Sequence, residues 1–148
     1  LGGLSNYREE ARSGTGWGAG GALGVRLAEA KDVRLYLRPE ASYHLLTFDI
    51  AGIPEDFSST FVSASLQLDA AAFGNWDLVP FLSVGGGWLH LDRGSLSETN
   101  EATLHVAGGA KFKITEGWYA APALQIIRAG GNPDTLHLLF AGALGQEF

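Results

Sequence analysis

Histidine, serine and aspartate side chains occur close together at two places in the chain, and acyl-transfer enzymes use these residue types. One group comprises His90, Asp92, Ser95 and Ser97, and the other comprises His44 and Asp49. An acyl-transfer nucleophile needs a base within hydrogen-bond reach, and spacing along the chain does not establish that reach. We interpret these histidines as hydrogen-bonded structural residues, and we expect no catalytic residue in this chain.

The sequence does not indicate a metal, cofactor or nucleic-acid site. The chain has no cysteine, and none of its histidine pairs has metal-ligand spacing with a carboxylate partner. A net charge of −6 and a pI of about 5.1 oppose binding to a phosphate backbone. The glycine-rich stretch from Gly14 to Gly20 opens a predicted strand and not a helix, so we do not expect it to cradle a phosphate. We predict no cofactor, no metal ion and no nucleic-acid partner.

Composition and length indicate one strand-rich domain over residues 1–148. Glycine accounts for 21 of 148 residues, and these glycines lie within alternating apolar runs, not in linkers. The absence of cysteine suits an oxidising compartment. With no initiator methionine and no signal-peptide pattern, we interpret the sequence as mature or trimmed protein. No apolar run approaches the roughly 18 residues of a spanning helix, so a membrane crossing would have to use strands.

Period-two alternation predicts eight strands in a regular meander. They are Leu1 to Arg8, Gly16 to Ala28, Val33 to Ile50, Thr60 to Ala72, Leu78 to Asp92, Ala102 to Thr115, Trp118 to Ala129 and Thr135 to Phe148. Most reach the length of about 9–11 residues that a tilted strand needs to cross a hydrocarbon core. The sequence therefore favours an all-β fold, an eight-stranded antiparallel up-and-down transmembrane barrel.

The predicted connections fall into two alternating sets. The turns are Glu29 to Asp32, Phe73 to Asp77 and Glu116 to Gly117, and the loops are Glu9 to Thr15, Ala51 to Ser59, Arg93 to Glu101 and Gly130 to Asp134. Short turns at one end and longer loops at the other are typical of transmembrane barrels.

Each strand separates apolar residues from polar or small ones. In the third, Val33, Leu35 and Leu37 share one face, while Arg34 and Arg38 share the other. A soluble barrel would place the apolar face inside, whereas a membrane barrel places it outside. Glycine, alanine and serine accompany the polar faces, as the crowded interior of an eight-stranded barrel requires.

A membrane barrel would direct many charged and polar side chains into its lumen. We predict a lumen charge network of Arg26, Arg34, Arg38, Glu40, His44, Asp69, His105, Lys111, Lys113 and His137, with Gln67 and Gln125 beside them. A simple register over the loop from Ala51 to Ser59 predicts that Glu40 lies about opposite Asp69, with Arg38 diagonal to it. Such a network would fill the lumen, so we expect no wide pore.

Aromatic residues are predicted to form two belts at the strand ends. Trp17, Tyr43, Phe48 and Trp88 lie toward the loop ends, and Phe73, Trp76, Trp118, Tyr119 and Phe148 lie toward the turn ends. Tryptophan and tyrosine collect at both membrane interfaces because their rings are apolar while their N–H or O–H groups bind water.

The second half of the chain resembles a known family. The segments from Val79 to Trp88 and from Leu104 to Trp118 are similar to recurrent phrases of small bacterial outer-membrane barrels, the superfamily of the OmpA transmembrane domain, OmpX and Ail. The final strand ends on Phe148, which resembles the sorting signal that the barrel assembly machinery reads. The resemblance implies location in the bacterial outer membrane, among outer-membrane lipid and lipopolysaccharide. It also implies contact with the assembly machinery during biogenesis.

The expected function is a non-enzymatic structural or surface-interaction role, with other envelope proteins as candidate partners. One alternative is a lipid-modifying enzyme, because outer-membrane lipid A deacylases and acyltransferases use this architecture. The deacylase pattern in which histidine and serine are separated by one residue does not occur at His44, His90, His105 or His137. The second alternative is a soluble lipocalin-like carrier, suggested by Gly86-Gly87-Trp88. That triplet lies in the fifth predicted strand, whereas a lipocalin carries it in the first.

Overall fold

The strands pair into a closed antiparallel ring. The computed structural model describes residues 2–9, 12–50, 53–71, 77–92, 98–130 and 136–146, with side chains in 16–47, 55–71, 77–92, 98–130 and 136–146. The strands are β1 Gly2–Glu9, β2 Arg12–Ala22, β3 Val25–Ala30, β4 Val33–Ile50, β5 Ile53–Ala70, β6 Leu78–Asp92, β7 Glu98–Thr115, β8 Trp118–Gly130 and β9 Leu136–Gln146. From β4 to β9 each strand pairs with the next, β1 joins β9 to β2, and β2 also pairs with β4.

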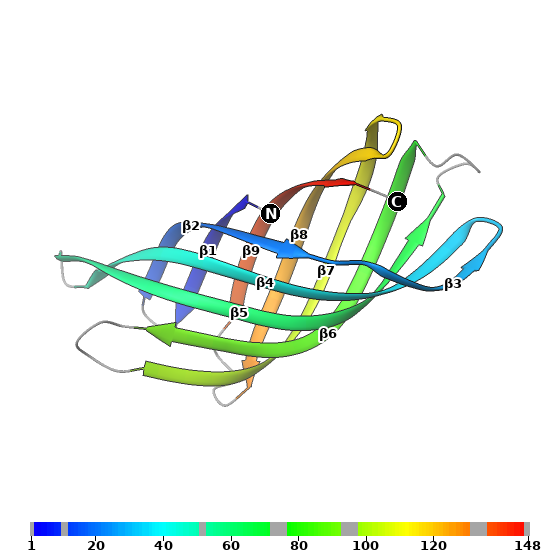
Figure 1. Ribbon diagram of the computed structural model, residues 1–148. Helices are drawn as coiled ribbons and strands as arrows, with labels where there is room; N and C mark the ends of the chain where they lie inside the picture. Colours follow the sequence, from blue (N-terminus) through cyan, green and yellow to red (C-terminus); the bar gives the residue numbers. More distant parts are fainter. Residues whose placement is uncertain are drawn as a thin grey trace.

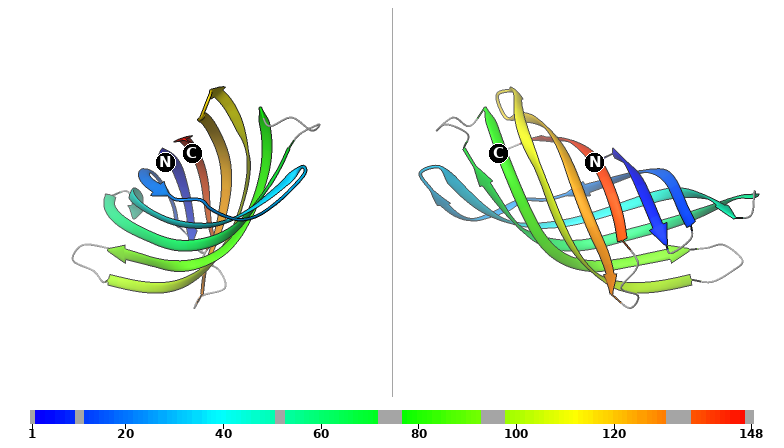
Figure 2. Two further views of the ribbon diagram at one scale, coloured as in Figure 1. Left: turned by 45° about the vertical axis from the view of Figure 1, so that its right-hand side comes forward. Right: turned by 180° about the vertical axis from the view of Figure 1, so that it is seen from behind.

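Strands β2 and β3 occupy one position in this ring. The register that pairs Ala22 with Glu40 continues to Val25 and Leu37, and the Leu23 amide donates to the Pro39 carbonyl at 3.0 Å. The nine strands therefore fill eight positions, which confirms the predicted eight-stranded antiparallel barrel. Figures 1 and 2 show the strands running obliquely, with the β3–β4 and β7–β8 connections at one end and the β4–β5 connection at the other. We call these the turn end and the loop end.

Large apolar side chains cover the outer face of the barrel, while the lumen holds both polar and apolar side chains. On β5, Val62, Leu66 and Leu68 are exposed, whereas Ser65 and Gln67 are buried. The same alternation of exposed and buried residues runs along β6. A soluble barrel exposes polar side chains on its outer face, whereas the exposed apolar side chains here match a barrel whose outer face lies in hydrocarbon. No helix in the described ranges is long and apolar enough to span a membrane.

The predicted loops are too long, because the strands continue into them. Strand β5 begins at Ile53 and pairs with the end of β4 through Ile50, so the predicted loop from Ala51 to Ser59 is mostly strand. Strands β2 and β7 likewise begin earlier than predicted, at Arg12 and Glu98. Proline, serine and charged residues suggested a loop, but cross-strand pairing overrides such local preferences.

The longer β4–β5 hairpin changes the predicted register. Glu40 lies opposite Ser63, and Asp69 lies opposite Arg34, so the predicted pairing of Glu40 with Asp69 was wrong. Hairpin register depends on loop length, and an error in the loop shifts every pair along both strands.

A bulge at Leu27 changes which face the end of β3 presents. The register of β3 against β4 shifts between Arg26 and Ala28, so Glu29 pairs with Arg34 and faces inward. An extra residue in one strand reverses the alternation beyond it. Glu29, predicted only as a turn residue, thus joins the charged interior.

Several inward glycines leave room for a side chain from the neighbouring strand. A Cβ on Gly18 would lie 2.2 Å from His44 Nδ1, and a Cβ on Gly145 would lie 2.2 Å from Cζ of Tyr119. By contrast, a Cβ on the outward Gly21 would have no heavy atom within 4 Å. Close packing inside the barrel therefore accounts for glycine at Gly18 and Gly145.

Candidate functional site: the polar interior of the barrel

A chain of hydrogen bonds crosses the lumen from β7 to β4. Lys111 Nζ donates to Asp69 Oδ2 at 2.5 Å, and Gln67 Nε2 donates to Asp69 Oδ1 at 2.7 Å. Arg38 Nη1 then donates to Gln67 Oε1 at 2.7 Å. Because Asp69 is only 2% exposed, its charge depends on these donors and not on water.

Glu40 extends this chain to β8. Arg38 Nε lies 3.8 Å from Glu40 Oε2, while Ser63 Oγ and Gln125 Nε2 each donate to Glu40 Oε1 at 3.1 Å. We call the connected residues the lumen network: Arg38, Glu40, Ser63, Gln67, Asp69, Lys111 and Gln125. Asp69 has a cationic and a neutral donor, and Glu40 has two neutral donors with Arg38 as its ion-pair partner. Such satisfied partners make a buried polar network stable.

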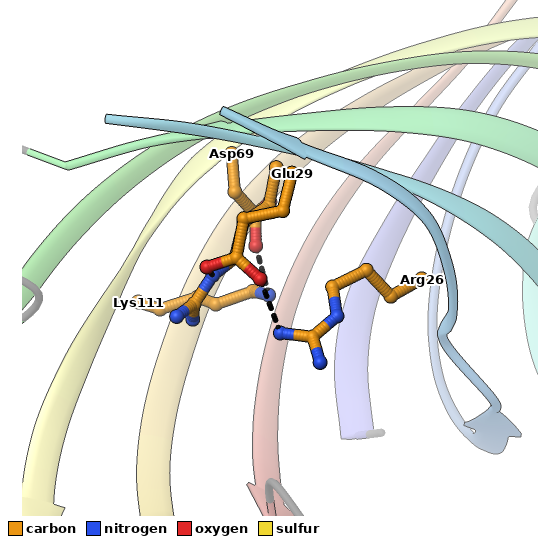
Figure 3. A network of polar contacts seen from close by, with 5 residues as sticks. Arg26, Glu29, Asp69 and Lys111 are labelled. Carbon is orange, nitrogen blue, oxygen red and sulfur yellow. Dashed lines mark hydrogen bonds and ion pairs between the residues drawn. The ribbon is translucent and has the colours of Figure 1, made fainter. Parts of the chain in front are cut away.

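A second ionic group lies at the turn end. Arg26 Nη1 is 2.7 Å from Glu29 Oε2, and Arg34 Nε is 2.9 Å from Glu29 Oε1. Figure 3 shows the Arg26–Glu29 contact together with that between Asp69 and Lys111. The two groups adjoin, since Arg34 is the cross-strand neighbour of Asp69.

Two tyrosines surround the ammonium group of Lys111. Its Nζ lies 5.0 Å from the ring centroid of Tyr36 on β4 and 5.2 Å from that of Tyr119 on β8. Cations attract the faces of aromatic rings over such distances. Together with Asp69, these rings hold Lys111 inside the turn-end half of the barrel.

A cluster of buried apolar side chains lies in the lumen toward the loop end, beside buried polar side chains. Phe61, Leu89, Leu91 and Ile127 form a buried cluster on the inner faces of β5, β6 and β8. We call it the apolar cap. The cap was not predicted from the sequence. Phe61 alternates in step with the inward Ser63 and Ser65, and this alternation could have identified it.

The remaining predicted lumen residues fall into two environments. His44 and His105 are buried on the inner face, and His105 packs edge-on against Phe61 with ring centroids 5.5 Å apart. His137 lies on the inner face of β9, opposite Ile127. Lys113 instead lies at the turn-end rim, where its exposed Nζ is 3.7 Å from Asp77 Oδ1. The ionic contacts described here thus lie in the lumen network, in the group around Glu29 and at the turn-end rim.

The candidate catalytic residues are divided between the two faces of the wall. His90 Nδ1 forms a hydrogen bond with Asn100 Oδ1 at 2.8 Å on the outer face, while Ser95 and Ser97 lie outside the described residues. On the inner face, His44 Nε2 is 2.9 Å from Ser42 Oγ, a contact that sequence reasoning missed. Among the described residues His44 Nδ1 has no hydrogen-bond partner, so no carboxylate there orients the ring as a catalytic base requires.

The structure describes part of each of the two predicted aromatic belts. Trp17, Tyr43 and Trp88 are 62%, 50% and 61% exposed near the loop end, and Trp118 is 47% exposed at the turn end. Tyr119 was predicted to join Trp118, but it faces the lumen because adjacent strand residues point to opposite faces. Phe73, Trp76 and Phe148 lie outside the described residues.

Comparisons with known proteins agree with this fold. No family model and no curated protein sequence matches the chain. Among solved structures, Neisserial surface protein A (NspA) aligns with a TM-score of 0.76 at 12% identity, over 99% of this chain and 93% of that one. The outer membrane enzyme PagL aligns at 0.60 and 12% identity over 100% of both chains. Ail, the attachment invasion locus protein of Yersinia pestis, aligns at 0.58 and 13% identity, over 99% of this chain and 93% of that one.

The fold and the outward apolar face define a class of protein. The chain has the fold of the small outer-membrane β-barrels, so the predicted resemblance to that superfamily is confirmed at the level of fold. Since one structure with this fold is an enzyme, the fold leaves the activity open.

Proposed function

We propose that this protein is a non-enzymatic barrel of the bacterial outer membrane, with a structural or surface-interaction role and a lumen closed by its own side chains. The observation that carries the proposal is the filled interior. The lumen network joins β4, β5, β7 and β8 across the barrel, and the apolar cap packs inside it toward the loop end. An eight-stranded barrel has room only for its own side chains, and here they are connected to one another.

The outer surface supports the membrane location. Leu66, Leu82 and Leu104 are exposed on the outer face between the aromatic belts, where lipid would cover them. On this proposal the barrel contacts outer-membrane lipid and lipopolysaccharide, and it meets the barrel assembly machinery during biogenesis.

The element best placed to meet other envelope components is the β4–β5 hairpin. Its strands continue past Tyr43 and Thr60, and the exposed Thr47 Oγ1 donates to Asp56 Oδ1 at 2.9 Å near its tip. Figure 1 shows this hairpin extending from the loop end of the barrel. A hairpin held by paired strands presents its polar residues on a defined scaffold, which suits it to contact with a partner.

Two measurements on intact cells test the proposal. Lipid A from cells that produce the protein should have the same mass spectrum as lipid A from cells without it, whereas a lost or added acyl chain would show an enzyme. A photo-crosslinker at Asp56 should capture envelope components that one at the lipid-facing Leu66 does not. Identical capture at both positions would contradict a role for the hairpin.

A further inference from the structure

Four polar side chains along the inner face of β7 carry buried atoms that have no hydrogen-bond partner among the described residues. Thr103 and His105 are 5% and 2% exposed, and Thr99 and Glu101 alternate in step with them toward the loop end. The atoms are Thr99 Oγ1, Glu101 Oε2, Thr103 Oγ1 and both ring nitrogens of His105. We call these four residues the β7 column. Buried polar groups in native proteins nearly always have a hydrogen-bond partner, so these atoms require one.

The neighbouring strands do not supply these partners. The cross-strand neighbours of the column are glycine or apolar residues: Leu91, Leu89, Gly87 and Gly85 on β6, and Ala129 and Ile127 on β8. None of these side chains has a nitrogen or oxygen atom, and three of them belong to the apolar cap. The partners must therefore come from the lumen in front of the column.

The chemistry of the column specifies a ligand that both donates and accepts hydrogen bonds. An ionised carboxylate such as Glu101 only accepts, a threonine hydroxyl does both, and a neutral imidazole presents one donor and one acceptor. A metal ion would satisfy only the acceptors, and the described ranges contain no group of three or more His, Cys, Asp or Glu residues that could hold one. Water satisfies donors and acceptors alike, and buried water commonly bridges such groups.

We propose that the β7 column binds a file of internal water molecules that leads from the loop end to the lumen network. Inward residues two apart on a strand are about 6.6 Å apart. A water molecule that forms two hydrogen bonds of about 2.8 Å spans most of this distance, so the side chains can be linked in sequence. The file ends at His105, which interacts electrostatically with Glu40 and Arg38 of the lumen network. Solvent thereby reaches Glu40 through single bound waters, which is compatible with a lumen closed to ions.

Radical labelling of the full chain refolded in detergent micelles tests this proposal. X-ray irradiation splits bound water in place, so the hydroxyl radicals that it forms oxidise side chains beside that water even when they are buried. Leu89 and Ile127, opposite Glu101 and His105, should be oxidised on irradiation, as read by mass spectrometry. Hydroxyl radicals produced in the bulk solvent from peroxide are the control, and they should leave these two buried residues unlabelled. Equal labelling by the two sources, or none by either, would overturn the proposal.

A second arm tests whether the column itself holds the water. Thr103→Val preserves the shape of the side chain but removes its hydroxyl group, so radiolytic oxidation of Leu89 and Ile127 should be largely lost. Thr60→Val makes the same change on the outer face and should leave that oxidation unchanged, with the heat-dependent gel shift showing that both variants fold. Equal oxidation in the two variants would overturn the assignment of the water to the β7 column. Conductance measures closure of the lumen separately, so a dry column would leave the proposed function standing.

Discussion

Lys111 on β7 reaches past β6 to Asp69 on β5, and its ammonium nitrogen lies 2.5 Å from Asp69 Oδ2. The contact crosses the inside of the barrel between strands that are not neighbours. It therefore fixes the lumen as a packed interior and gives Asp69 its cationic partner.

Replacing Lys111 with methionine should destabilise the barrel by about 3–5 kcal/mol, because breaking a buried ion pair leaves an uncompensated charge. Urea unfolding in detergent, followed by tryptophan fluorescence, measures the free energy of unfolding. The double variant Lys111→Met with Asp69→Asn should recover much of the loss. Arg26→Met, at an exposed ion pair, is the control and should change stability by at most about 1 kcal/mol. Equal stability of Lys111→Met and the wild type would contradict a buried pair.

Gly18 and Gly21 form a matched pair on opposite faces of β2. Gly18→Ala should cost about 1–3 kcal/mol, because its Cβ would clash with His44 and the Tyr43 carbonyl oxygen. Gly21→Ala adds the same methyl group on the outer face, where no heavy atom lies within 4 Å, and should be nearly neutral. The same unfolding measurement compares them. A larger loss for Gly21→Ala would show that the faces of β2 are assigned the wrong way round.

How far the sequence predicts this structure can be seen in Glu40, Asp69 and Glu29. Alternation over β4 and β5 correctly predicts that Glu40 and Asp69 face inward, since period two is a local property. Their predicted pairing fails because register depends on where the hairpin turns, and residues 53–59 have loop-like composition but form strand. Glu29 was missed because a single bulge residue, Leu27, reverses the face and has no clear sequence signature.

The aromatic residues inside the barrel also could not be predicted fully from the sequence. Outward tryptophans at strand ends could be predicted, because interface preference depends on residue type. The inward positions of Phe61 and Tyr119 were not predicted, because the alternation of the strand and not aromatic type decides which face a side chain occupies. Contacts across the lumen, such as that between Gln125 and Glu40, join residues far apart in sequence, and no local pattern encodes them.

A charge on the outer face should oppose folding into lipid according to its depth. Leu66→Arg places a cation on β5 between the two aromatic belts and should cost about 2–4 kcal/mol. Thr60→Arg lies on the same face opposite Tyr43 of the loop-end belt and should cost about 0–1 kcal/mol. Folding yield into lipid vesicles, read from the heat-dependent gel shift of folded barrels, compares the two. Efficient folding of Leu66→Arg in plain buffer would contradict the membrane location.

Deletion of Phe148 should reduce delivery to the outer membrane while leaving the purified protein able to refold in detergent. One aromatic ring contributes at most about 1.5–3 kcal/mol by burial, too little to unfold a ring of long strands. Surface levels in cells and refolding yield in vitro are the two readouts. Normal surface levels would exclude a sorting role, and failed refolding would show that Phe148 is structural.

Planar-bilayer recording of the wild-type protein tests the closed lumen most directly. With the lumen network joining four strands and the apolar cap packed toward the loop end, the barrel should show at most small and infrequent conductance steps. A steady, large conductance from single inserted copies would contradict the filled interior and the function proposed from it.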